Sequence, residues 1–166
     1  MNTFTAIYEN KWLTLIDDAT SQEVGKISYQ QPLDIYISIN EDKFQLSPEK
    51  RKIKIFKNYK KIDTLVKYNF LGNYKSKKSK FRIKGISSWK GGTKLVDKND
   101  NLLLSVTNEN GFTNNGKYKI QTHQDEVAPY CILLSLHLHL KASKSNMLVP
   151  MITAILSVTL LRNFFY

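Results

Sequence analysis

The scarcity of cysteine and the lack of a secretory signal limit the classes of protein to which this chain can belong. Only one cysteine, Cys131, occurs among its 166 residues, so no disulfide can form within the chain and nothing indicates an oxidising compartment. Because Cys131 lies inside an apolar run, we interpret it as a buried structural thiol. The first residues lack the basic start and the uninterrupted apolar stretch of a secretory signal, which predicts a cytoplasmic protein.

Motifs for catalysis are missing as well. The sequence has no Gly-x-Ser-x-Gly nucleophile motif, and Gly91-Gly92 lacks the spacing of a phosphate-binding glycine loop. His137 and His139 would share a face of a strand and could bind one metal ion, with His123 as a third ligand, but on a helix they diverge by about 200°. We interpret them as polar residues at a barrel mouth or a helix end. We therefore expect no enzyme activity, no metal and no cofactor.

Short strands separated by turn residues are the dominant pattern up to residue 122. Residues 34–40, 51–55 and 80–84 each alternate apolar and polar side chains, as a strand with one buried face does. In the last two of these ranges the polar positions are basic, which predicts cations projecting from the outer face of a sheet.

Turn chemistry predicts a meander of antiparallel hairpins. The Asp/Asn cluster at Asp97–Asn101 favours a turn between two strands, and Asn114-Asn-Gly116 is typical of a tight hairpin turn with positive φ angles. Residues 75–80, Lys-Ser-Lys-Lys-Ser-Lys, predict a flexible basic loop.

Charge is spread unevenly along the chain. Residues 1–50 hold four basic and eight acidic side chains (net −4), residues 51–100 hold sixteen and three (net +13), and the remainder hold five and three (net +2). Such a positive region attracts phosphates, whether of anionic lipids or of nucleic acid, although a solvated lysine-rich surface is the alternative interpretation. The candidate anion-binding residues are its strand and turn cations: Lys52, Lys54, Lys57, Lys60, Lys61, Arg82 and Lys84.

Two apolar runs without Lys, Arg, Asp or Glu follow, and the first is ambiguous. Residues 134–140 alternate strictly, as a strand does, whereas Asp125, Glu126 and Pro129 suit the first turn of a helix. A helix over Val127–Leu140 would be apolar nearly all round, which means burial on every side. The pattern alone leaves strand and helix open.

The second run, Met147–Leu161, is fifteen residues long, short of the roughly twenty that span a bilayer. We predict a linker at residues 141–146 and an apolar helix over residues 147–166. A membrane anchor and a helix packed on protein both fit this pattern. Its membrane or partner contacts would be Met147, Leu148, Ile152, Ile155, Leu156, Leu160, Phe164 and Phe165.

A family resemblance joins these features. The strand at Phe81–Gly85, the hairpin Lys94–Val106 with its turn at Asp97–Asn101, the strand Lys117–Thr122 and the apolar Val127–Leu140 together resemble the C-terminal half of the tubby-like superfamily. That superfamily includes the LURP-one-related proteins and the phospholipid scramblases. The resemblance implies a mainly β fold: an antiparallel barrel of hairpins over residues 1–140, with the helix 127–140 threaded through it.

Three functions follow from this reading. The first is a non-enzymatic tubby-like barrel that binds anionic phospholipid, or a membrane-associated protein, through its basic surface. The second is a barrel that binds single-stranded nucleic acid, with Tyr59 and Tyr74 as stacking platforms beside the same cations. The third is a structural subunit that docks through its C-terminal helix. We expect a cytoplasmic location, with membrane association through the C-terminal segment as one possibility.

Overall fold

The computed structural model describes residues 1–29, 35–69, 73–85, 92–110, 113–124 and 127–142. These residues form twelve β-strands and one helix, which covers residues 129–142. The strands are β1 (Thr3–Glu9), β2 (Trp12–Asp17), β3 (Glu23–Ser28), β4 (Ile35–Ile39), β5 (Asp42–Glu49), β6 (Lys52–Lys57), β7 (Lys60–Lys67), β8 (Tyr74–Ser76), β9 (Arg82–Lys84), β10 (Thr93–Val96), β11 (Leu102–Asn110) and β12 (Thr113–Thr122).

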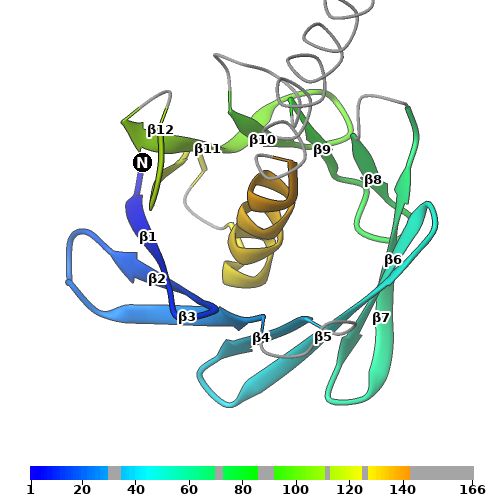
Figure 1. Ribbon diagram of the computed structural model, residues 1–166. Coiled ribbons are helices and arrows are strands. Elements are labelled where there is room, and N and C mark those ends of the chain that lie inside the picture. Colours follow the sequence, from blue (N-terminus) through cyan, green and yellow to red (C-terminus); the bar gives the residue numbers. More distant parts are fainter. Residues whose placement is uncertain (30–34, 70–72, 86–91, 111–112, 125–126, 143–166) are drawn as a thin grey trace, which may run out of the picture.

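The strands close into one antiparallel barrel (Figure 1). Each strand pairs with its neighbours in sequence, and β1 pairs with β12 so that Thr3 lies opposite Gln121 and Ile7 opposite Lys117. Closure leaves none of the twelve described strands with an unpaired edge. The predicted antiparallel barrel is therefore confirmed, and position along the sequence corresponds to position around the circumference.

Alternation of side chains builds the inner wall, as the sequence predicts. The strands expected at residues 34–40, 51–55 and 80–84 are found as β4, β6 and β9. Their apolar positions point inward: Ile37, Ile53 and Ile83 are each at most 2% exposed.

The helix of residues 129–142, here called the central helix, runs through the barrel (Figure 1). Every side chain from residue 131 to residue 140 is buried, including the polar Ser135. A helix without a solvent-facing side is stable here because the barrel wall surrounds it with apolar side chains. The helix interpretation is confirmed and the strand alternative for residues 134–140 is wrong, although the helix begins two residues later than predicted and continues to residue 142, the last described residue.

The antiparallel meander divides the turns between two ends of the barrel. β12 runs towards Thr122, which lies opposite Leu104 near the β10–β11 turn, and the chain then enters the central helix. We call this the entry end. It also carries the β2–β3, β4–β5, β6–β7 and β8–β9 turns, while the central helix runs from there towards the opposite, exit end.

Close packing between wall and helix depends on a glycine in β3. A Cβ atom at Gly25 would lie 2.7 Å from the backbone oxygen of Ser38 and 3.1 Å from Cδ1 of Leu133 in the central helix. The absence of a side chain at Gly25 therefore lets the helix approach this part of the wall.

One of the two predicted turns is confirmed and the other is wrong. Asp97 accepts hydrogen bonds from the backbone N–H groups of Asn99 (2.8 Å) and Asn101 (2.9 Å), which closes the β10–β11 turn as expected. The Asn114–Gly116 segment is not a hairpin turn but part of β12, because the β11–β12 pairing already begins with Asn110 opposite Thr113. Gly116 has the positive φ of 79° that the sequence suggested, but inside a strand.

The predicted helix over residues 147–166, with all of its proposed membrane or partner contacts, lies outside the described residues. Among the described residues, no helix has the length and apolar character needed to cross a membrane.

Candidate functional site

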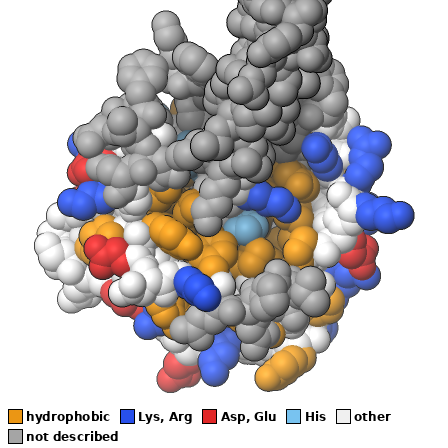
Figure 2. Space-filling view, viewed as in Figure 1, with side chains coloured by type: hydrophobic (Ala, Val, Ile, Leu, Met, Phe, Trp, Pro, Cys, Tyr) orange, Lys and Arg blue, Asp and Glu red, His pale blue; other side chains and the backbone are white. Residues whose placement is uncertain are grey.

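Positive charge is concentrated on one side of the barrel. Because the strands follow chain order around the circumference, the basic region of residues 51–100 becomes the arc from β6 to β10, which we call the basic arc. Residues 1–50, with net charge −4, form the opposite wall from β1 to β5. Figure 2, viewed as in Figure 1, shows Lys and Arg side chains around the periphery and hydrophobic side chains gathered towards the centre.

A row of cations crosses four strands of the basic arc. Lys52 on β6 lies opposite Val66 on β7, Val66 lies opposite Lys75 on β8, and Lys75 lies opposite Arg82 on β9. The row faces outward, because the residues next to its members along the strands, Ile53, Leu65 and Ile83, are buried and point inward. At a strand spacing of about 4.8 Å, it spans about 14 Å from Lys52 to Arg82.

Lys75 was missed as a site residue. The sequence assigns it to a flexible loop, because residues 75–80 contain only Lys and Ser and therefore show no alternation of apolar and polar side chains around the short β8. Its exposed side chain nevertheless belongs to the outward row between Lys52 and Arg82.

Carboxylates neutralise three of the predicted cations on the outer wall. Lys54 pairs with Glu49 on β5, while Arg82 (2.9 Å) and Lys84 both pair with Asp100 in the β10–β11 turn. The hydrogen bond from Lys54 lowers the pKa of Glu49, and that from Lys84 lowers the pKa of Asp100. Both acids therefore stay ionised and compete with any external anion.

Lys57 does not belong to the outer wall. It lies opposite the buried Phe44, with its Nζ atom 5.6 Å from the centroid of that ring, and it pairs with Asp42 at 2.7 Å. Phe44 in turn stacks on Tyr130 of the central helix at 5.4 Å between centroids. Lys57 is thus held at the inner rim of the entry end.

Lys60 and Lys61 begin β7 at the entry end, beside the β6–β7 turn. The register shifts between Ile55 and Phe56, so that Lys61 lies opposite Phe56. Both lysines are exposed, and within the described part of the chain neither forms an ion pair. The structure therefore divides the seven predicted residues between the outer wall and the rim of the entry end.

The loop at residues 75–80 is ordered around a buried carboxylate, so the prediction of a flexible basic loop is wrong. Asp63, 5% exposed, accepts hydrogen bonds from the hydroxyl groups of Ser76 (2.5 Å) and Ser79 (3.0 Å). It also accepts from the backbone N–H groups of Thr64 (2.6 Å) and Lys78 (3.1 Å). Burial alone would raise the pKa of Asp63, but these hydrogen bonds outweigh it and lower the pKa, so the carboxylate is ionised.

No protein-family model, curated protein or solved structure matches this chain. The assignment of a site therefore depends on the geometry of this chain.

The two histidines of the central helix point to different parts of the wall. His137 Nδ1 lies 3.2 Å from the hydroxyl of Tyr29, whereas His139 lies between the hydroxyl of Thr93 (3.0 Å from Nδ1) and Oδ1 of Asn108 (3.0 Å from Nε2). The Asn108 oxygen can only accept, so Nε2 of His139 carries the proton and Nδ1 accepts from Thr93. Burial lowers the pKa of His139 to about 4, which keeps the ring neutral. Neither histidine is part of a cluster of potential metal ligands among the described residues.

Cys131 is a structural thiol, as the sequence suggests. It is 7% exposed and burial raises its pKa to about 11, so little thiolate forms at neutral pH. It borders a hollow of about 450 Å³ at the entry end, where Ser79, Lys80, Asp97 and Tyr130 are among the other lining residues.

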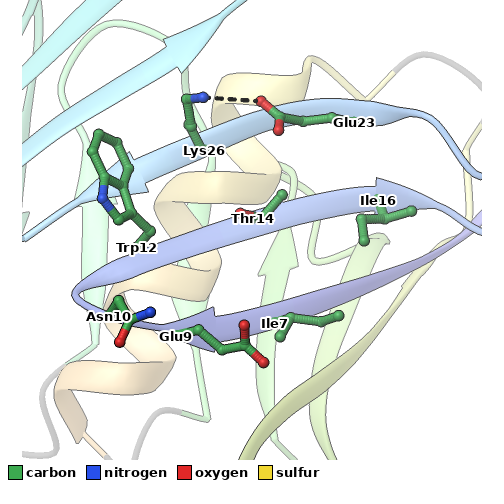
Figure 3. A pocket seen from close by; sticks show the side chains of 8 residues that line it. All are labelled: Ile7, Glu9, Asn10, Trp12, Thr14, Ile16, Glu23 and Lys26. Atoms are coloured by element: carbon green, nitrogen blue, oxygen red, sulfur yellow. Dashed lines mark ion pairs between the residues drawn. The ribbon is translucent and has the colours of Figure 1, made fainter.

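A second hollow, of about 480 Å³, lies on the outer face of β1, β2 and β3 (Figure 3). Trp12 forms its apolar side, and Lys26 lies between the Trp12 ring, 5.6 Å from its centroid, and Glu23 at 3.5 Å. In the strand order these strands face the basic arc across the barrel. This hollow is therefore separate from the candidate anion-binding surface.

Proposed function

We propose that this chain is a non-enzymatic, tubby-like barrel that binds anionic phospholipid at a membrane surface through its basic arc. The observation that carries the proposal is the segregation of charge around a closed barrel, with net +13 in residues 51–100 and net −4 in residues 1–50. Such a molecule turns its positive side towards an anionic surface before any specific contact forms. Each Lys or Arg that reaches the headgroup layer adds about 1 kcal/mol to binding.

The order of elements supports the tubby-like part of the proposal. The resemblance implies hairpins that form a barrel and then an apolar helix threaded through it. This chain has twelve antiparallel strands in sequence order, followed by a helix buried on every side.

The type of cation also favours a membrane. Lysine makes flexible point contacts with phosphates, whereas a site for one defined phosphate more often uses the planar fork of arginine. Lys52 and Lys75 project from the outer wall, with Val66 between them. A wall of this kind suits a broad, anionic surface better than a single small ligand.

Single-stranded nucleic acid is supported less well. Of the two proposed stacking residues, Tyr59 is 97% exposed, but Tyr74 packs against the core and burial raises its pKa. Binding of successive bases needs successive exposed rings along a groove. Docking of a structural subunit through residues 147–166 stays a prediction, because it depends on residues outside the described ranges.

Vesicle co-sedimentation of the full chain tests the proposal. We expect binding to phosphatidylcholine vesicles that contain phosphatidylserine, little binding to pure phosphatidylcholine, and weaker binding as salt rises. Replacing Lys52 or Lys75 by Ala should weaken the partition about fivefold, and Lys26→Ala on the opposite wall should not. Equal binding to neutral and anionic vesicles would contradict the electrostatic mechanism.

A gain of binding provides an independent test. Glu49→Gln removes the carboxylate that pairs with Lys54 and also acts on Lys52 and Lys61, so anionic vesicles should bind about fivefold more tightly. The matched control is Glu23→Gln, which breaks the Lys26 ion pair on the opposite wall. If both variants bind equally well, the basic arc is not the contact surface.

A further inference from the structure

We propose that the β6–β7 turn is a membrane anchor: the ring of Tyr59, at the entry-end edge of the basic arc, inserts into the interface of an anionic bilayer while the outer wall of the arc lies against the headgroups. This inference rests on the proposed function and adds the point of insertion and the orientation. The anchor consists of Tyr59 and the lysines around it, Lys43, Lys60 and Lys61.

Tyr59 has a strained backbone conformation that reduces the stability of the fold. The β6–β7 connection is a two-residue turn in which both Asn58 (φ 47°) and Tyr59 (φ 66°) have positive φ. Asn suits this conformation, but the second position favours Gly, and a bulky side chain with positive φ is an outlier. Sidechain packing does not compensate for this strain, because Tyr59 is 97% exposed.

A comparable turn in the same chain shows what the fold alone requires. The β1–β2 turn also has two residues with positive φ, Asn10 (49°) and Lys11 (66°), and its second residue is polar. An aromatic ring at that position is therefore not a demand of the turn. A strained, exposed aromatic indicates a role outside the fold.

The turn is also held rigidly. The backbone N–H of Asn58 donates to the carbonyl oxygen of Lys43 (3.0 Å), and the N–H of Lys43 donates to Oδ1 of Asn58 (3.4 Å). These bonds tie the tip of the β6–β7 hairpin to the start of β5. A ring on a fixed tip loses little conformational freedom when it enters a bilayer.

The surrounding charge fits an anionic membrane interface. Lys43, Lys60 and Lys61 have exposed side chains, and Lys77 and Lys78 lie in the β8–β9 turn at the same end. Tyrosine concentrates at the headgroup level of bilayers, and lysines beside it can reach the phosphates. The central helix begins at this end as well, which adds its positive dipole end.

A membrane fits this tip better than single-stranded nucleic acid does. Tyr59 projects from a convex turn, where one ring can stack on one base at most. Insertion into an interface needs only one projecting ring with cations beside it.

The test uses Tyr59→Gly in the full chain with phosphatidylcholine–phosphatidylserine vesicles. Glycine relieves the positive-φ strain, so this variant should unfold at higher urea concentration than the wild type. Its vesicle partition should nevertheless fall about tenfold, through loss of roughly a quarter of the area that a tyrosine side chain can bury. Tyr36→Ala, which removes a 36% exposed tyrosine from the wall at β4, is the control and should bind as the wild type does.

A fluorescent label then reports insertion directly. Cys131 is buried, so a Tyr59→Cys variant can be labelled selectively with a polarity-sensitive dye, and Tyr36→Cys provides the matched control. The emission at position 59 should shift to the blue with anionic vesicles and be quenched by nitroxide lipids, while position 36 stays unchanged.

The outcomes separate this inference from the proposed function. If the wild type and Tyr59→Gly bind vesicles equally, or if the label at position 59 stays in water, the anchor is wrong while the basic arc stands. If the wild type does not bind anionic vesicles, both proposals are wrong. If Tyr59→Gly instead weakens binding of a labelled single-stranded oligonucleotide and leaves vesicle binding intact, Tyr59 is a stacking residue.

Discussion

The buried His139 makes stability depend on pH in a defined window. Its pKa is lowered from 6.5 to about 4 by burial, so the folded chain keeps the ring neutral between these values while the unfolded chain takes up a proton. Proton uptake by the unfolded chain favours unfolding. The stabilisation is therefore complete above pH 6.5 and is lost progressively as the pH falls to about 4.

The magnitude follows from the size of the shift. A difference of about 2.5 pH units at 1.36 kcal/mol per unit gives a loss of about 3 kcal/mol in the free energy of unfolding between pH 6.5 and pH 4. This is a large part of the 5–15 kcal/mol that is typical of a domain. Asp63 acts in a different window, because its lowered pKa makes its contribution disappear only below the ordinary pKa range of a carboxyl group.

Urea unfolding at a series of pH values from 7 to 4 measures this loss. The variant His139→Gln keeps a polar side chain beside Thr93 and Asn108 but cannot titrate. It should be less stable than the wild type at pH 7, through poorer hydrogen bonds, and should lose about 3 kcal/mol less on acidification. The control is His123→Gln, at an exposed position. If the wild type and His139→Gln lose stability equally between pH 6.5 and pH 4, the acid sensitivity does not come from His139.

Two further predictions concern the packing of the barrel. Gly25→Ala should lower the free energy of unfolding by about 1–3 kcal/mol, because its Cβ atom would contact the Ser38 carbonyl oxygen at 2.7 Å; Lys26→Ala, on the other face of β3, should change it little in the same urea titration. Asp63→Asn should cost about 2–4 kcal/mol, because an amide cannot accept all four of the hydrogen bonds that the carboxylate accepts. Limited trypsin digestion should then cut the Asp63 variant faster at the lysines of the β8–β9 turn, and an unchanged cleavage rate would show that Asp63 does not order this loop.

The fold was accessible from the sequence wherever one strand carries its own pattern. The stretches that contain β4, β6 and β9, residues 34–40, 51–55 and 80–84, alternate over five to seven residues each. For residues 129–142 the pattern left strand and helix open, and the helix was implied by the family resemblance. The prediction of a hairpin turn at Asn114–Gly116 was wrong because the positive φ that Gly116 favours is also accommodated inside β12. The residue type therefore predicts the backbone conformation, whereas the pairing between strands determines whether the residue lies in a turn or within a strand.

The candidate site was harder to predict, because the ion pairs and hydrogen bonds of its residues join strands and turns that are separate in the sequence. The partners of Lys54 and Arg82 lie on neighbouring elements, Glu49 across the β5–β6 pair and Asp100 in the next turn. The order of the 75–80 loop depends on Asp63, thirteen residues before Ser76. Sequence gives the number of cations, whereas the register decides which of them are available to a ligand.

The closure of the barrel between β1 and β12 also constrains how the chain can fold during synthesis. The first strand to leave the ribosome has to wait for the last strand before its second side is paired. The apolar inner face of all the preceding strands stays uncovered until the central helix, the last described element, has been made. Pairing between strands so far apart in sequence is slow, and until it is complete the hydrophobic surface stays exposed and prone to aggregation. A nascent chain that stalls before residue 142 therefore has no core, and we expect it to depend on chaperones or to aggregate.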